Sequence, residues 1–355
     1  MSLTTTHPIS NLLLQWYATH KRDLPWRNIN NAYYIWLSEI ILQQTRVAQG
    51  LPYYVNFITA YPTVQKLANA PEQDVLKLWQ GLGYYSRARN LHAAAKMVIT
   101  DFNGVFPTDY INLKKLKGVG EYTASAIASF ASNEAKAVVD GNVYRVLSRL
   151  YNVATPIDST EGVKLFSTLA YELLPQLNAG EHNQAMMELG ATCCKPKLPM
   201  CEACPVLQYC QAFKANTINE LPVKSKKTKV TARYFYYLII EDAQQHTLIH
   251  QRPAGDIWQG LYEFVLIEST SVLTPTELKK EVQSKLGNLK FNITQQSTSV
   301  KHVLSHQHLY TVFCTLQVAT LPVIASTLAI PMAVINNYPL PRLIDKYLNE
   351  HFFNQ

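Results

Sequence analysis

The chain has 355 residues, is 48% hydrophobic and only 16% charged, and carries a formal net charge of +7. This length allows two or three domains with filled cores, and the small basic excess permits a polyanionic partner without requiring one. No hydrophobic run reaches the roughly 18 residues of a membrane-spanning helix, and the N-terminus shows no signal segment. We therefore expect a soluble protein in a reducing compartment, where thiols serve as ligands rather than in disulfides.

The region from residue 7 to 213 has a helical pattern. Hydrophobic residues recur there at three- and four-residue spacing, interrupted by proline and glycine, which predicts a mainly α domain. The predicted helical stretches are residues 9–17, 33–57, 75–82, 91–99, 123–131 and 143–150.

A basic linker is predicted for residues 214–233. Between residues 223 and 233 the chain has five basic residues and no acidic one: Lys224, Lys226, Lys227, Lys229 and Arg233. Such a segment is either a solvated, flexible tether or a strap along a phosphate backbone, and the sequence leaves both interpretations open.

The remaining residues, 234–355, have the pattern of a second, α+β domain. Residues 234–240 and 308–316 are rich in aromatic and β-branched side chains, which is typical of strands. Residues 276–286 and 341–350 predict helices, the second with Pro341 at its first position.

One carboxylate, Glu39, lies in an otherwise apolar helical stretch. It either faces water at an edge of the helix or is buried with a raised pKa, as a general acid requires. The residues that follow, Gln43, Gln44 and Thr45, form a polar end suited to reading bases.

Gly118, Val119 and Gly120 form a Gly-x-Gly turn between two predicted helices. The glycines allow a sharp turn and a close approach to a ligand, and the free N–H groups that start the next helix can bind a phosphate. Lys114 and Lys117 add positive charge nearby. A tight helix–helix turn without a ligand has the same sequence pattern, so both interpretations remain.

Asp140 precedes a new helix about twenty residues further on. An Asp in this position is most often an N-cap. It could also lie beside a sugar held by the preceding turn and stabilise positive charge that develops on the ring.

Aromatic residues and arginines gather in two further places. Arg22, Trp26 and Arg27 lie early in the chain, and residues 81–89 read GLGYYSRAR. Flat rings beside guanidinium groups suit stacking on bases and pairing with phosphates, although core packing would explain the rings equally well.

Four cysteines lie close together: Cys194, Cys201, Cys204 and Cys210. Zinc ribbons usually present two separate close pairs, whereas this set has one. Four soft anionic ligands on a short loop suit an iron–sulfur cluster, and a structural zinc site is the alternative.

Together these motifs resemble the helix-hairpin-helix DNA glycosylases of the endonuclease III superfamily. Residues 24–27 (LPWR), 36–45 (WLSEIILQQT), 81–90 (GLGYYSRARN), 139–143 (VDGNV) and 183–190 (NQAMMELG) are similar to its adenine DNA glycosylase (MutY) branch. The C-terminal part resembles, more weakly, the MutT-like (Nudix-fold) domain of that branch. The resemblance implies a mainly α glycosylase domain with a 4Fe-4S cluster on the four cysteines, followed by an α+β domain.

The resemblance also implies base excision repair, in which adenine mispaired with 8-oxoguanine or guanine is removed from duplex DNA. Glu39 would protonate the adenine as general acid, and Asp140 would stabilise the oxocarbenium-like sugar, as paired carboxylates do in glycoside hydrolysis. Asn142 and Tyr122 would hold Asp140 and the sugar in place.

The target adenosine would be flipped out of the duplex into a pocket of the enzyme. The resemblance assigns this pocket to Trp26, Arg27, Leu42, Val47 and Gln184. Contacts to DNA would come from Gly118, Val119, Gly120, Thr45 and Arg87, and from Gln44 and Tyr84, which would wedge into the gap in the stack.

Tyr122 separates two reaction types. Bifunctional relatives carry a lysine two residues after the second hairpin glycine, and its amine attacks the sugar and permits strand cleavage. This chain has Tyr122 there, so we expect a monofunctional glycosylase.

The C-terminal domain lacks the glutamate-dense helix of an active Nudix hydrolase, so we expect no nucleotide hydrolysis. The lesion-reading loop of the family has the sequence Phe-Ser-His, and this chain has Leu304, Ser305 and His306. Ser305 and His306 would still hydrogen-bond an oxidised guanine, but the aromatic ring is missing.

Two alternatives remain: a glycosylase of the same fold for another mispaired or damaged base, and a non-catalytic iron–sulfur protein that binds DNA. The appended C-terminal domain, Gln184 and Tyr122 argue against the first alternative, and the presence of both Glu39 and Asp140 argues against the second. We expect a monomer in a bacterial cytoplasm, associated with the nucleoid in use. Lys195 and Lys197 of the cysteine loop would face the DNA backbone.

Overall fold

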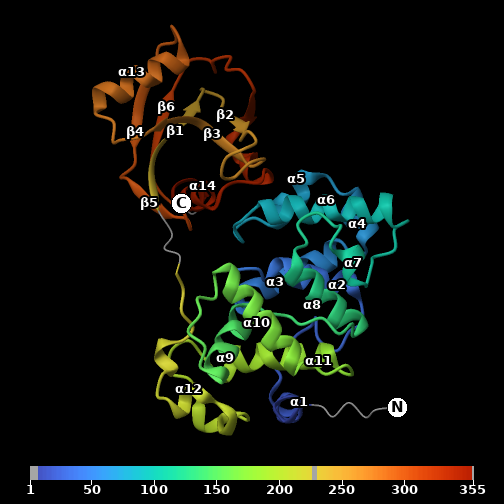
Figure 1. Cartoon of the computed structure of the whole chain (residues 1–355). Helices are drawn as coiled ribbons and strands as arrows, with labels where there is room; N and C mark the ends of the chain where they lie inside the picture. The colour runs from blue at the N-terminus through green and yellow to red at the C-terminus, as the bar shows by residue number, and fades with distance from the viewer. Residues whose placement is uncertain (1–6, 226–229, 354–355) are drawn as a thin grey trace. The chain divides into compact units, whose positions relative to one another are not determined.

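The computed structural model describes residues 7–225 and 230–353. The chain forms two compact units, one made of Met1–Asn69 with Asn90–Lys226 and the other of Ala70–Arg89 with Lys227–Gln355 (Figure 1). The sequence did not indicate that residues 70–89 would group with the C-terminal domain.

The first unit is mainly α-helical, as predicted. Its helices are α1 (Pro8–His20), α2 (Ala32–Ile41), α3 (Val47–Ala60), α4 (Val64–Asn69), most of α6 (Ser86–Asp101), α7 (Tyr110–Leu113), α8 (Glu121–Ser132), α9 (Gly141–Tyr151), α10 (Thr160–Leu173), α11 (Ala179–Glu188) and α12 (Gln211–Lys214).

The prediction of a continuous helical pattern over residues 33–57 is wrong. Helix α2 ends at Ile41, and α3 begins only at Val47. Between them Gln44 has a φ of 54°, a left-handed conformation that no α-helix can continue through. This break places the polar residues 43–46 at the end of α2, where a cavity opens.

Helix α9 fixes the start of the segment that contains Asp140. Its residues Val143, Val146, Leu147 and Leu150 repeat at helical spacing and are all buried in one cluster with α1, α10 and α11. Each buried aliphatic side chain contributes about 1.5–3 kcal/mol. The orientation of the helix, and of the residue that caps it, is therefore set by the core.

The second unit contains a seven-stranded mixed sheet. Its order is β4–β6–β1–β3–β2–β7, with β5 also paired to β6; β1 and β6 run parallel, and the other registered pairs are antiparallel. The strands are β1 (Thr231–Glu241), β2 (His246–Gln251), β3 (Tyr262–Ser269), β4 (Asn292–Gln296), β5 (Val300–Val303), β6 (Gln307–Gln317) and β7 (Thr327–Pro331).

Helices cover both faces of this sheet, as Figure 1 shows for α13 (Pro275–Leu286) and α14 (Arg342–Leu348). Strand β1 is buried on both sides because it lies centrally. Its Tyr237 and Ile239 pack in the cluster that includes α14, and Leu238 and Ile240 in the cluster that includes α13. The unit also contains α5 (Glu72–Leu78). This α+β architecture confirms the predicted fold class.

The predicted helices of this unit are found where the sequence placed them. Helix α13 begins with a capping box between Thr274 and Glu277. Helix α14 begins at Arg342, so Pro341 is its N-cap rather than its first residue. Both predicted strands are present, as β1 and β6.

The predicted linker, residues 214–233, contains structure at both ends. Residues 218–220 form a 3-10 turn, and strand β1 begins at Thr231. Arg233 does not belong to a basic strap, because it forms ion pairs with Asp256 and Glu268. Lys226, Lys227 and Lys229 lie outside the described residues, and the domain boundaries stay a prediction.

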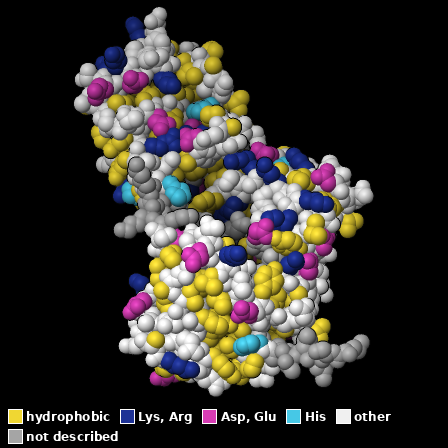
Figure 2. Space-filling view, in the orientation of Figure 1, with side chains coloured by type: hydrophobic (Ala, Val, Ile, Leu, Met, Phe, Trp, Pro, Cys, Tyr) yellow, Lys and Arg dark blue, Asp and Glu magenta, His cyan; other side chains and the backbone are white. Residues whose placement is uncertain are grey.

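In the described part of the chain, no helix combines the length and the hydrophobicity needed to cross a membrane. On the face seen in Figure 2, Lys and Arg side chains are interspersed with Asp and Glu on both units. This mixture agrees with a net charge that is only mildly basic.

Candidate active site

A cavity of about 600 Å³ lies in the helical unit, between the loop before α2, the break after α2 and the first turns of α8 and α9. The structure brings nine of the predicted site residues to its walls: Trp26, Arg27, Glu39, Leu42, Thr45, Val47, Tyr122, Asp140 and Asn142.

Glu39 is buried in this cavity, with 8% of its surface exposed. Its Oε2 accepts a hydrogen bond from the Tyr122 hydroxyl at 2.9 Å. Burial, and to a smaller extent the charge of Asp140, raise the pKa of Glu39 to about 7 against the opposing effect of the Tyr122 hydrogen bond. This carboxyl group can therefore hold or release a proton near neutral pH.

Tyr122 lies in the first turn of α8, directly after the hairpin. Burial and the neighbouring carboxylates raise its pKa well above 10, so its hydroxyl stays protonated. It can therefore donate a hydrogen bond to Glu39 but cannot replace a nucleophilic amine.

Asp140 is the N-cap of α9. Its Oδ1 accepts hydrogen bonds from the backbone N–H groups of Asn142 and Val143, each at 2.8 Å, and its Oδ2 accepts one from Asn142 Nδ2 at 2.8 Å. The carboxylate also lines the cavity. Asp140 therefore both caps the helix and faces the cavity. Burial raises the pKa of Asp140 despite these hydrogen bonds.

Arg145 connects this carboxylate to the cysteine loop. Its Nη2 donates to Asn142 Oδ1 at 2.9 Å and to the Gly190 carbonyl at 2.7 Å, and its Nε donates to the Cys194 carbonyl at 2.8 Å. A continuous series of hydrogen bonds therefore runs from Asp140 through Asn142 and Arg145 to the backbone of Cys194.

Glu188, at the end of α11, also lines this cavity. The sequence did not indicate its role in holding Arg27. Its side chain is fully buried, accepts hydrogen bonds from Arg22 at 2.7 and 2.8 Å, and accepts one from Arg27 Nη2 at 2.6 Å. Arg27 Nη1 donates to the Arg22 carbonyl at 2.9 Å, so Arg27 is held on both sides. A signal was present, because Glu188 lies in the 183–190 stretch that carries the resemblance and directly follows three apolar residues.

Gln184 is not among the residues that line this cavity. It lines a separate space of about 380 Å³, and its Oε1 accepts a hydrogen bond from the Tyr17 hydroxyl at 2.9 Å. The structure therefore does not bring Gln184 to Glu39 as the sequence analysis expected.

The hairpin connects α7 to α8. Gly118 has a φ of 75°, and a Cβ there would lie 2.7 Å from Asn90 Cβ, whereas a Cβ at Gly120 would meet nothing within 4 Å. Val119 is buried, so only the glycines lie at the surface. Lys114 is ion-paired with Glu121, which offsets part of the positive charge predicted here.

The break after α2 carries the other two predicted DNA contacts of this unit. Gln44 is exposed on its left-handed backbone, whereas Thr45 is half-buried and lines the cavity. A residue with an exposed amide beside the cavity mouth suits the predicted wedge position.

Arg149 of α9 binds the cysteine loop through hydrogen bonds. This buried guanidinium donates to the carbonyls of Lys195 at 2.8 Å and Ile218 at 3.0 Å, and to Cys194 Sγ at 3.4 Å. Burial and the neighbouring cysteines raise the pKa of Cys201, so the four thiols interact electrostatically. Within the described ranges, no group of three or more His, Cys, Asp or Glu is arranged to hold a single metal ion.

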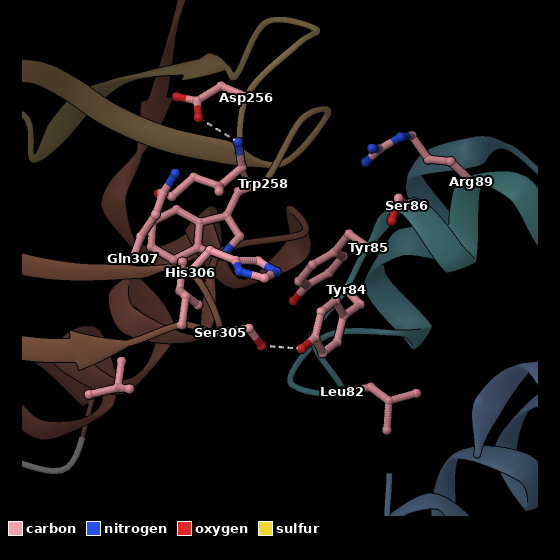
Figure 3. A pocket seen from close by; sticks show the side chains of 14 residues that line it. Leu82, Tyr84, Tyr85, Ser86, Arg89, Asp256, Trp258, Ser305, His306 and Gln307 are labelled. Carbon is pink, nitrogen blue, oxygen red and sulfur yellow. Dashed lines mark hydrogen bonds between the residues drawn. The ribbon is translucent and has the colours of Figure 1, made fainter. Parts of the chain in front are cut away.

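The second unit has a cavity of about 420 Å³ that contains the predicted lesion-reading loop (Figure 3). Leu304, Ser305 and His306 form the turn between β5 and β6. Leu304 packs against the hydrophobic core of this unit, and the Ser305 hydroxyl is hydrogen-bonded to the Tyr84 hydroxyl.

Arg87 is engaged within its own segment. Its guanidinium lies 5.2 Å from the Trp79 ring centre and 5.5 Å from that of Tyr84, and its Nη2 donates to the Gly83 carbonyl at 3.3 Å. These contacts order the segment that presents Tyr84.

Two family models match the chain. Residues 37–167 match the HhH-GPD superfamily base excision DNA repair protein model, and residues 236–350 match the NUDIX domain model. Among solved structures, a thermostable thymine-DNA glycosylase superposes with a TM-score of 0.54 at 28% identity, over 58% of this chain and 95% of that one.

The chain is also similar to curated proteins over most of its length. It is 34% identical over 306 residues to the adenine DNA glycosylase of Buchnera aphidicola subsp. Schizaphis graminum, covering 85% of each chain. It is 45% identical over 209 residues to the Homo sapiens adenine DNA glycosylase, covering 56% of this chain and 38% of the human one. With a glycosylase fold, a Nudix domain and these relatives, the chain belongs to the adenine DNA glycosylase family.

Proposed function

We propose that this protein hydrolyses the N-glycosidic bond of adenine mispaired with 8-oxoguanine or guanine in duplex DNA. The observation that carries the proposal is the cavity in which Glu39 and Asp140 lie together, with the Tyr122 hydroxyl bonded to Glu39. The names of the relatives, adenine DNA glycosylase, support adenine as the base.

Glu39 is the general acid in this mechanism. Its raised pKa keeps a large fraction of the carboxyl protonated near neutral pH, so it can protonate the adenine ring and improve the leaving group. After the base departs, the carboxylate formed can accept a proton from the attacking water. The hydrogen bond from Tyr122 fixes the orientation of this group.

Asp140 stabilises the positive charge that develops on the sugar. Asn142 and the start of α9 hold its carboxylate by three hydrogen bonds of 2.8 Å, which fix its position before the reaction begins. A charge fixed in advance costs no reorganisation in the transition state.

The cavity walls receive the flipped base. Trp26 and Leu42 supply flat and apolar surface, and Arg27, fixed by Glu188, supplies hydrogen-bond donors. The exposed hairpin glycines, with Gln44 and Thr45 at the break after α2, bind the DNA that presents this base. Gln184 lines a different space and is not part of this proposed pocket.

A 4Fe-4S cluster fits the cysteine loop. Cys194, Cys201, Cys204 and Cys210 are four soft donors beside the cationic Arg149. Each iron of such a cluster needs one soft anionic ligand, and this set supplies four. Bound there, the cluster would order the loop and present Lys197, which is exposed, to a DNA phosphate.

The lesion is read by the second unit. Ser305 and His306 offer hydrogen-bonding groups at the cavity that also contains Tyr84. These groups would contact the 8-oxoguanine opposite the excised adenine.

A panel of duplexes tests this function. Under single-turnover conditions we expect excision of adenine opposite 8-oxoguanine and, more slowly, opposite guanine. We expect no thymine release from thymine:guanine pairs. Strands should break only after alkali, because Tyr122 offers no amine. Thymine release, or rapid nicking without alkali, would contradict the assignment.

A further inference from the structure

The cavity of the second unit is lined by three aromatic side chains from two segments. Tyr84 and Tyr85 come from the segment 82–86, and Trp258 comes from the loop between β2 and β3. In Figure 3, Trp258 and His306 lie together on one side of the cavity, and Tyr84 and Tyr85 lie on the opposite side. Polar groups of Ser305, His306 and Gln307 also line this cavity, so aromatic rings adjoin a polar edge.

The backbone of Trp258 is strained. Its φ is 60°, in the left-handed region that bulky side chains rarely adopt. Such a conformation costs about 1–3 kcal/mol and persists where the surrounding structure enforces it, commonly at binding sites.

Hydrogen bonds and ion pairs on the preceding residues enforce this conformation. Arg252 Nε donates to the Ile257 carbonyl at 2.7 Å, and Asp256 Oδ1 accepts from the Ile257 N–H at 2.7 Å. Arg233 binds Asp256 at 2.6 Å, and the buried Arg252 binds the buried Glu263 at 2.8 Å. The loop that carries Trp258 is therefore a rigid wall of the cavity.

Leu304 contributes only an aliphatic side chain to this cavity. It is the first residue of the 304–306 turn, has no ring, and packs against the core of the unit. Trp258 is also half-buried and packed against this core, and its indole lines the same cavity from a different loop. Its indole is the largest ring among the lining residues.

We propose that Trp258 is a specificity-determining residue of this chain, whose indole stacks on the flat face of an oxidised purine while residues 305–307 bind its polar edge. This inference rests on the proposed function, because it takes the base from the mispair that the enzyme reads. Stacking of a base on an aromatic side chain is worth about 1–3 kcal/mol.

Two variants separate the ring from the backbone conformation. Trp258→Asn removes the indole, and asparagine adopts a positive φ more readily than tryptophan does. Trp258→Phe keeps a flat ring. Tyr310→Leu is the matched control, because Tyr310 stacks on Tyr234 in the same unit and does not line the cavity.

The measurement is equilibrium binding of the full chain to two duplexes. They carry 8-oxoguanine or guanine opposite 2′-fluoro-2′-deoxyadenosine, which resists excision. We expect Trp258→Asn to reduce the preference for 8-oxoguanine by about tenfold or more, and Trp258→Phe to retain most of it. Tyr310→Leu should behave as the wild type.

An unchanged preference in Trp258→Asn would overturn the inference, and so would an equal loss of affinity for both duplexes. If Trp258→Asn does not fold, the tryptophan fluorescence of the wild type and of Trp258→Phe should be measured as each duplex is added. The wild type should show quenching that depends on 8-oxoguanine and is absent in Trp258→Phe; equal quenching in both would contradict the proposal. Binding does not require excision, so a wild type that prefers 8-oxoguanine but releases no adenine would contradict only the proposed function.

Discussion

Glu39 is a carboxyl group that the fold buries against its own preference for water. Its pKa rises from 4.5 to about 7, so the folded protein holds a proton that the unfolded chain releases between these values. The resulting stability is fully present below pH 4.5 and is lost as the pH rises through 7. At 1.36 kcal/mol for each pKa unit, the loss amounts to about 3 kcal/mol.

Glu39→Gln removes this cost without changing the shape of the side chain. We expect the variant to unfold at higher denaturant concentration than the wild type at pH 8, and the difference to shrink at pH 5. Denaturation curves at the two pH values measure it. Equal stability of both proteins at pH 8 would show that Glu39 ionises without penalty.

The same group sets the pH dependence of catalysis. Because the protonated carboxyl is the general acid, the single-turnover rate of the wild type should fall as the pH rises through about 7. A rate that stays level from pH 6 to 9 would remove Glu39 from this role.

At the scale of elements, the hairpin glycines have separate tasks. Gly118 has a left-handed backbone with Asn90 directly against it, whereas Gly120 has an extended backbone and open space before it. Gly118 is therefore required by the fold, and Gly120 leaves room for a ligand to approach.

Alanine substitutions test this division. Gly118→Ala should lower the free energy of unfolding by about 1–3 kcal/mol. Gly120→Ala should cost about 1 kcal/mol or less, since only a cap preference is lost, yet it should weaken DNA binding. Thermal unfolding and binding titrations measure the two effects. Full DNA affinity in Gly120→Ala would mean that no phosphate approaches there.

An element can be predicted from the sequence when its boundaries are marked by a local residue pattern. Helix α13 is predictable because its amphipathic spacing begins at a capping box. The break after α2 is not, because the hydrophobic spacing continues across it and only the φ of Gln44 interrupts the helix. The motifs predicted most of the cavity lining. They could not predict that Glu188 would fix Arg27, because that contact joins residues 161 positions apart.

At the scale of the whole molecule, the packing of residues 70–89 was equally out of reach of the sequence. Gln73 donates to the Tyr262 hydroxyl at 2.6 Å and Gln80 to Asp345 at 3.0 Å, which are contacts between distant parts of the chain. Nothing in a helical pattern indicates which domain a helix joins.

The series from Asp140 to Cys194 links the proposed cluster to the proposed catalytic carboxylate. Arg145→Lys would remove the contact that holds Asn142, so we expect adenine excision to slow by about 10–100-fold. Iron content and excision rate should be measured together, with the exposed Arg342→Lys as control. Full activity with full iron would show that Asn142 needs no support from Arg145.

Adenine release depends on Glu39 as the general acid, and this is the central prediction. The most direct measurement is the amount of free adenine released from a duplex with adenine opposite 8-oxoguanine, by the wild type, Glu39→Gln and the exposed control Glu172→Gln. We predict release by the wild type and the control, and a rate at least about 100-fold lower for Glu39→Gln. No free adenine from the wild type, or equal rates for wild type and Glu39→Gln, would contradict it.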